Sequence, residues 1–75
     1  MREEVLYAKR QADWNRLSQL SHAARGSLKK MPPDELEEMV RLYRQASGDL
    51  AWLSTHSGNR EVIEYLNSVV QHAYA

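Results

Sequence analysis

The side chains of this sequence that can do chemistry are histidines, serines and carboxylates, and their spacing matches no known catalytic or metal-binding arrangement. The histidines are His22, His56 and His72, and cysteine is absent. No HExxH motif and no pair of histidines one helical turn apart occurs, so we expect no metal and no cofactor. The serines form no GxSxG elbow, and there is no glycine-rich phosphate loop. We therefore expect that the protein is not an enzyme and has no catalytic residues.

Arg10 and Asp49 are the polar residues with the clearest structural interpretation. Each lies at or beside a stripe of apolar residues that recur at helical spacing. If the two stripes pack together, the sequence predicts an ion pair between helices, which would specify their register more than it would add net stability, because desolvation offsets most of the Coulomb attraction. The alternative is that each side chain extends to solvent at the edge of its stripe.

Trp52 projects away from the apolar stripe of its own helix and toward Arg41 and Gln45. An exposed tryptophan beside arginines is typical of a protein contact surface. We therefore take Arg41, Arg44 and Trp52 as candidate contacts for a partner protein. The alternative is that Trp52 folds over the end of its helix, against the loop or the following helix.

The length and charge of the chain exclude several classes of protein. Its 75 residues suffice for one domain, and a domain this small is marginally stable, so a partner, an oligomer or a continuing chain is expected. The formal net charge is +0, which is atypical of nucleic-acid binders. No signal peptide opens the chain and no apolar run approaches the ~20 residues that cross a bilayer. The lack of cysteine fits a reducing compartment.

The charges are unevenly distributed along the sequence. Residues 1–30 carry seven basic and three acidic side chains, whereas residues 31–75 carry three basic and seven acidic ones. This asymmetry predicts attraction between packed helices. An alternative is that the basic N-terminal part lies near anionic lipid headgroups.

Hydrophobic periodicity predicts three helices, over residues of about 2–24, 33–55 and 60–74. Pro33 and the carboxylates that follow it are typical of a helix start, and Asn59 is a good N-cap for the third helix. Ser57 and Gly58 end the second helix, with the glycine able to take the left-handed conformation. The apolar face of the second helix comprises Leu36, Met39, Val40, Leu42, Tyr43, Ala46, Leu50 and Leu53.

Short loops between these helices predict an all-α fold, an antiparallel three-helix bundle that forms a single domain over residues 1–75. In the register that best matches the first two apolar stripes, Arg10 lies beside Asp49 and Trp14 packs against the small Ala46. The helical pattern of the third segment continues to the last residues without a capping signal. We therefore expect the chain to be a segment excised from a longer polypeptide.

Several short motifs resemble one known family. The matching residues are Trp14 with Leu17, Pro33–Leu36, Leu42–Arg44, Asp49–Ala51 and Tyr65–Asn67. With these residues the chain resembles, over nearly all of its length, the N-terminal soluble segment of the stage II sporulation protein M family of bacterial integral membrane proteins. A departure is Met31-Pro32 before Pro33, where a serine or threonine cap would be usual.

The resemblance implies a non-catalytic interaction or scaffolding domain on the cytoplasmic side of the cell membrane. In that family the segment precedes several transmembrane helices, and founding members act with partner proteins that remodel peptidoglycan during sporulation. Protein partners are therefore expected, together with membrane attachment through downstream helices, and nucleic acid is not. The alternative is a free-standing small helical adaptor that homodimerises.

Overall fold

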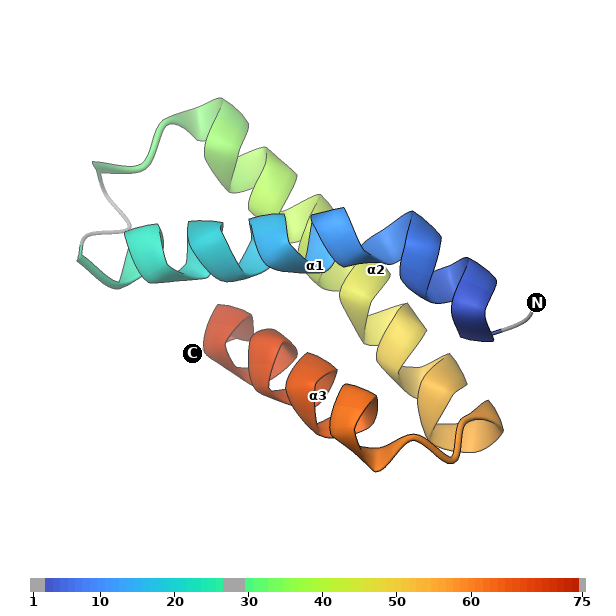
Figure 1. The fold of residues 1–75 in the computed structure, drawn as a ribbon. Helices are drawn as coiled ribbons and strands as arrows, with labels where there is room; N and C mark the ends of the chain where they lie inside the picture. Colours follow the sequence, from blue (N-terminus) through green and yellow to red (C-terminus); the bar gives the residue numbers. More distant parts are fainter. Residues whose placement is uncertain (1–2, 27–29, 75) are drawn as a thin grey trace.

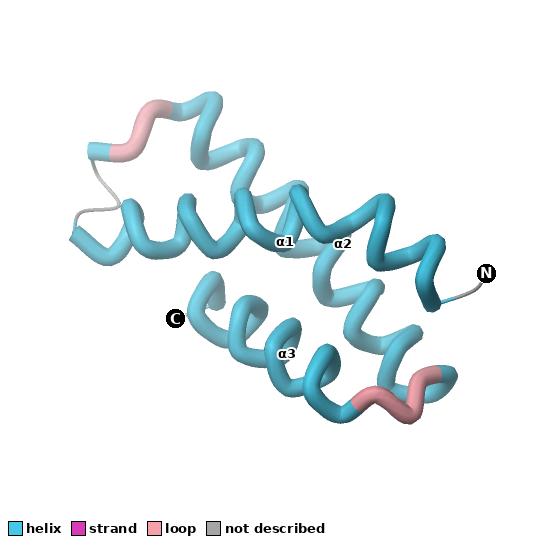
Figure 2. Tube along the Cα trace, viewed as in Figure 1, coloured by secondary structure: helices cyan, strands magenta, loops and turns pink. Residues whose placement is uncertain are grey.

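The computed structural model describes residues 3–26 and 30–74, and these residues form three helices and no strand (Figures 1 and 2). Helix α1 spans Glu3–Gly26, α2 spans Pro33–His56 and α3 spans Arg60–Tyr74. Consecutive helices run in opposite directions (Figure 1), and each of the three pairs of helices is in contact. The predicted all-α antiparallel three-helix bundle is therefore confirmed.

The predicted helix boundaries are close to the observed ones. Helix α1 continues to Gly26, α2 continues to His56, and α3 has the predicted bounds. Arg2, where the first helix was expected to begin, lies outside the described residues. These differences of one or two residues fall at helix ends, which fray.

Helix α2 begins at its prolines without a side-chain cap. Pro33 occupies the first turn, where its missing N–H has no partner to lose, and the carbonyl of Pro32 accepts a hydrogen bond from the Leu36 N–H at 3.0 Å. Asp34 and Glu35 lie in the same turn, so their negative charges face the positive end of the helix dipole. The carboxylates and the proline geometry thus replace the missing serine or threonine cap.

The loop from α2 to α3 differs in detail from the predicted one. Ser57 is extended, with φ −107° and ψ 141°, and its N–H donates to the Leu53 carbonyl at 2.8 Å. No glycine of the described residues has a positive φ, so the expectation of a left-handed Gly58 is wrong: the extended Ser57 ends the helix instead. Asn59 caps α3 as predicted, because its Oδ1 accepts from the Val62 N–H at 3.4 Å.

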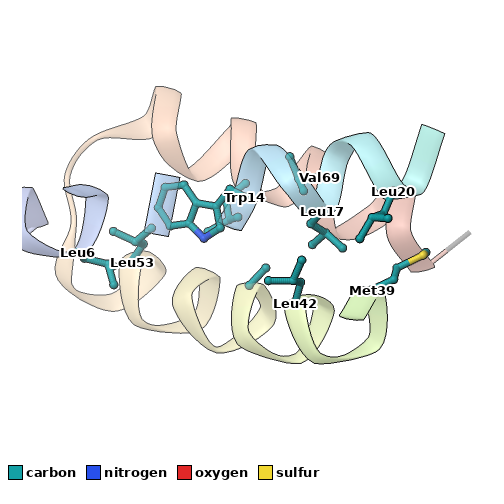
Figure 3. Packing of buried hydrophobic residues seen from close by; sticks show 10 residues of the cluster. Leu6, Trp14, Leu17, Leu20, Met39, Leu42, Leu53 and Val69 are labelled. Atoms are coloured by element: carbon teal, nitrogen blue, oxygen red, sulfur yellow. The ribbon is translucent and has the colours of Figure 1, made fainter. Parts of the chain in front are cut away.

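One hydrophobic core lies between the three helices. Leu17, Leu53 and Leu66, one from each helix, are 0% exposed, and Figure 3 shows buried side chains directed into the space between the helices. The other buried members are Leu6, Trp14, Leu20, Met39, Leu42, Ala46 and Val69. The packing of the predicted apolar stripes against one another accounts for this core.

Leu36 and Val40 were predicted to be in the core but lie on the surface, where they are 37% and 45% exposed. The cause is a difference in helix length: α2 has 24 residues and α3 has 15, or about 36 Å against about 22 Å of helix axis. Because α3 runs back along α2 from the C-terminal end of α2 and is shorter, it does not reach the first turns of α2 (Figure 1). The start of α2 therefore contacts α1 but has no α3 beside it.

Candidate functional site

The structure places Arg10 of α1 beside Asp49 of α2, as the sequence predicts. The Arg10 Nε lies 3.3 Å from Asp49 Oδ1 and 3.2 Å from Oδ2. The Asp49 side chain is 9% exposed and that of Arg10 is 32% exposed, so the carboxylate is buried while the guanidinium reaches the edge of the bundle. A buried carboxylate needs such partners, because desolvation of an unpaired charge is costly.

The same carboxylate has a second partner that the sequence pattern did not indicate. The indole Nε1 of Trp14 donates to Asp49 Oδ2 at 3.0 Å, and Trp14 is only 4% exposed. A buried tryptophan usually finds an acceptor for its N–H. This requirement is the feature of the sequence that could have indicated the Trp14–Asp49 hydrogen bond. Because Arg10 and Trp14 are one helical turn apart on α1, Asp49 ties two successive turns of α1 to one point on α2.

Two further polar contacts join α1 to α2 farther along the interface. Arg16 donates to Glu38 through Nε and Nη2, both at 3.1 Å, and Gln45 donates to Asp13 at 2.8 Å. The hydrogen bonds from Arg16 hold the pKa of Glu38 below its usual range. These contacts complement Asp49 in fixing the register of the helix pair.

The histidines lie at two separate places on the bundle. The rings of His22 on α1 and His72 on α3 stack with centroids 6.4 Å apart, whereas His56 lies at the end of α2. Among the described residues no group of three histidine, cysteine, aspartate or glutamate side chains is placed to hold a metal ion. The arrangement therefore offers no metal centre within this part of the chain.

Trp52 folds over the end of α2, which is the alternative that the sequence left open. It is partly buried and packs against the core, and its ring stacks on that of His56 with centroids 4.5 Å apart and an interplanar angle of 8°. The His56 Nδ1 also lies 2.9 Å from the Trp52 carbonyl oxygen. Much of the indole surface is thus already covered by the protein itself.

Arg41 and Arg44 lie elsewhere, on the exposed N-terminal half of α2. Together with Leu36, Glu37 and Val40 they line a shallow groove of about 490 Å³, which we call the α2 groove. No hydrogen bond or ion pair joins either arginine to another described residue. The structure therefore separates the predicted contact residues: the two arginines share a surface with exposed apolar side chains, and Trp52 does not.

The described residues thus define a small three-helix bundle. Inside it, Asp49 binds Arg10 and Trp14, and on its surface lies the α2 groove with its apolar and arginine side chains. None of the described helices is both long enough and apolar enough to cross a membrane. The chain belongs to the family described as Domain of unknown function (DUF8413), whose model matches residues 4–75. No curated protein and no solved structure matches the chain. Nothing in these comparisons links it to the stage II sporulation protein M family.

Proposed function

We propose that this chain is a non-catalytic docking domain that binds a protein partner through the α2 groove. The observation that carries the proposal is the presence of exposed Leu36 and Val40 in the same groove as Arg41 and Arg44. When a partner covers exposed apolar side chains, the complex is stabilised by about 25 cal/mol for each Å² of apolar surface that is removed from water. Arginines at the rim add orientation through bidentate bonds to carboxylates.

The setting that we propose is the cytoplasmic side of a bacterial integral membrane protein. This part of the proposal rests on the resemblance of the Leu42–Arg44 and Asp49–Ala51 motifs to the stage II sporulation protein M family. In such a protein the bundle would hold a partner near the membrane, while the membrane attachment would come from other segments.

A second candidate function is a homodimeric adaptor. It is favoured by the presence of both signs of charge in the α2 groove, with Glu37 about two turns before Arg44 on one helix. Two copies of α2 that pair in antiparallel orientation around Val40 would place Glu37 of each copy near Arg44 of the other. The exposed area of four or five side chains is small compared with the ~800 Å² per partner of a stable interface, so this dimer would be weak.

Site-specific photocrosslinking in the native cell tests the docking function. A photoreactive amino acid at position 40 should crosslink to one distinct protein, and Arg41→Glu with Arg44→Glu should abolish that product. A probe at Glu64, an exposed residue on α3, is the control and should give no such product. If the probe at position 40 of the otherwise unchanged protein gave no crosslink, or if position 64 gave an equal one, the proposal would be contradicted. A product with twice the mass of the chain would instead support the adaptor.

A further inference from the structure

A small cavity lies between α1 and α3, close to the last turns of both helices. It has a volume of about 140 Å³, and hydroxyl groups and two imidazole rings line it. The polar lining comprises Ser18, Ser21 and His22 from α1, with Ser68 and His72 from α3. We call it the histidine cavity, and it shares no residue with the α2 groove.

The two histidines of the cavity come from different helices, and their rings lie side by side. The ring centroids of His22 and His72 are 6.4 Å apart, and the ring planes are inclined by 27°. Imidazole nitrogens bind Zn²⁺ at about 2.0–2.1 Å, so two rings that share one ion have centroids about 5 Å apart. Both residues are exposed, and rotation about their side-chain bonds can bring the rings closer by the missing distance of about 1 Å.

A hydrogen bond determines which nitrogen of His72 is free to bind a metal. Its Nδ1 lies 2.8 Å from the carbonyl oxygen of Ser68, one turn earlier on α3. Because a carbonyl oxygen only accepts, Nδ1 carries the proton and donates it. In the neutral ring the lone pair is then on Nε2, as it is in many metal-binding histidines. No described residue forms a hydrogen bond with the His22 ring, so its nitrogens are also available.

The histidine cavity lies where the helix dipoles favour a cation. Helices α1 and α3 run in the same direction, and their C-terminal ends lie at the same end of the bundle (Figure 1). His22 is one turn before the last residue of α1, and His72 is in the last turn of α3. The negative ends of two helix dipoles therefore lie near the cavity. None of its described lining residues is a lysine or an arginine, so no cationic side chain of the lining repels a metal ion.

We propose that His22 and His72 together bind one divalent metal ion of the kind that prefers imidazole, such as Zn²⁺. Imidazole suits Zn²⁺, Cu²⁺ and Ni²⁺, whereas Mg²⁺ prefers oxygen ligands. Water molecules complete the coordination, and the cavity has room for several of them beside its serine hydroxyls. This site has two protein ligands and so differs from a centre of three, which the described residues do not form. The ion joins the end of α3 to α1, independently of the docking function proposed for the α2 groove.

Calorimetric titration of the chain without a histidine tag provides the test. The wild type should bind one Zn²⁺ per chain with a Kd below about 1 mM, whereas MgCl₂ should give no saturable binding. His22→Gln and His72→Gln should each weaken Zn²⁺ binding about tenfold or more, because two linked ligands bind far more tightly than either alone. His56→Gln changes a histidine outside the cavity and should bind like the wild type. No saturable binding of Zn²⁺ by the wild type, or an equal loss in His56→Gln, would overturn the proposal.

The double variant shows whether the two histidines hold the same ion. If they share it, His22→Gln combined with His72→Gln should lose much less binding free energy than the sum of the two single losses. Two ions per wild-type chain, with one ion lost in each single variant, would overturn the proposal.

Thermal unfolding measures the connection between α1 and α3. Saturating ZnCl₂ should raise the Tm of the wild type, because an ion that binds the folded state stabilises it, and should leave the Tm of His72→Gln nearly unchanged. Circular dichroism confirms that each variant is folded without the metal. A wild-type Tm that does not rise with Zn²⁺, or an equal rise in His72→Gln, would also overturn the proposal.

Discussion

Asp49 of α2 accepts the indole hydrogen bond of Trp14 from α1 at 3.0 Å, inside the core of the bundle. The same carboxylate pairs with Arg10, one turn earlier on α1. A slide of α1 by one turn along α2 would leave the buried Trp14 N–H and the Asp49 charge without these partners. The contact therefore selects one register among those that the apolar stripes alone would permit.

Asp49→Ala should lower the free energy of unfolding by about 2–3 kcal/mol, because it leaves the buried Trp14 N–H unsatisfied and removes the partner of Arg10. Asp49→Asn retains an oxygen that can accept from the indole, so it should cost less. Urea denaturation followed by circular dichroism measures both. If the free energy of unfolding of Asp49→Ala were within about 0.5 kcal/mol of the wild-type value, the contacts of Asp49 with Arg10 and Trp14 would contribute little to stability.

Arg10→Met should cost about 1–3 kcal/mol, because it leaves the buried Asp49 carboxylate without its cationic partner and with the Trp14 indole as its remaining hydrogen-bond donor. The Arg10 side chain is 32% exposed, and the methionine keeps the apolar part of the side chain. The same urea titration provides the comparison with Asp49→Ala. If the arginine variant were the less stable of the two, the ion pair rather than the indole hydrogen bond would dominate at Asp49.

The pairing of Arg10 with Asp49 could be predicted from the sequence because two short loops force the helices to be antiparallel, and the apolar stripes then allow one best alignment. The indole bond was not predicted, although Trp14 and Asp49 lie in the same aligned region. Apolar periodicity identifies which residues face the core, but it does not tell which atom of a buried side chain meets which acceptor. That choice depends on side-chain rotamers within the packed core.

The exposure of Leu36 and Val40 has a different origin. A helical wheel treats each helix as if a partner covered its whole length, whereas α3 is shorter than α2 and covers only part of it. The sequence contained the helix lengths that were needed for this conclusion. The periodic pattern therefore identified the buried residues in the C-terminal half of α2 correctly. At the start of the helix it placed Leu36 and Val40 in the core although they are exposed.

Truncations at Val40 and Leu42 test this description of α2. Val40→Ala should cost less than about 1 kcal/mol, because the side chain is already 45% exposed, while Leu42→Ala should cost about 2–5 kcal/mol through loss of a buried side chain. Thermal unfolding at a fixed protein concentration gives both values. Equal losses at the two positions would mean that Val40 is covered in solution, as in a dimer through the α2 groove.

The ion pair between Arg16 and Glu38 should make the stability depend on acid pH. In the folded protein the hydrogen bonds from Arg16 lower the pKa of Glu38 from its ordinary value of 4.5. The stabilisation is therefore complete above pH 4.5 and disappears as the pH falls through the lowered pKa. Glu38→Gln should remove this part of the acid sensitivity. Urea midpoints measured between neutral and acid pH should converge for wild type and variant at low pH, and parallel curves would contradict the assignment.

Gly48 lies in the middle of α2. Glycine is unfavourable there because it loses more conformational freedom on folding than any other residue. It has no positive φ, and a Cβ placed on it would meet no atom within 4 Å. Gly48→Ala should therefore raise the free energy of unfolding by about 0.5–1 kcal/mol. Ala51→Gly, at another exposed position of the same helix, is the matched reverse change and should lower it by a similar amount. Thermal and urea unfolding measure both, and a Gly48→Ala protein less stable than the wild type would show that residue 48 is not in a regular, open helix.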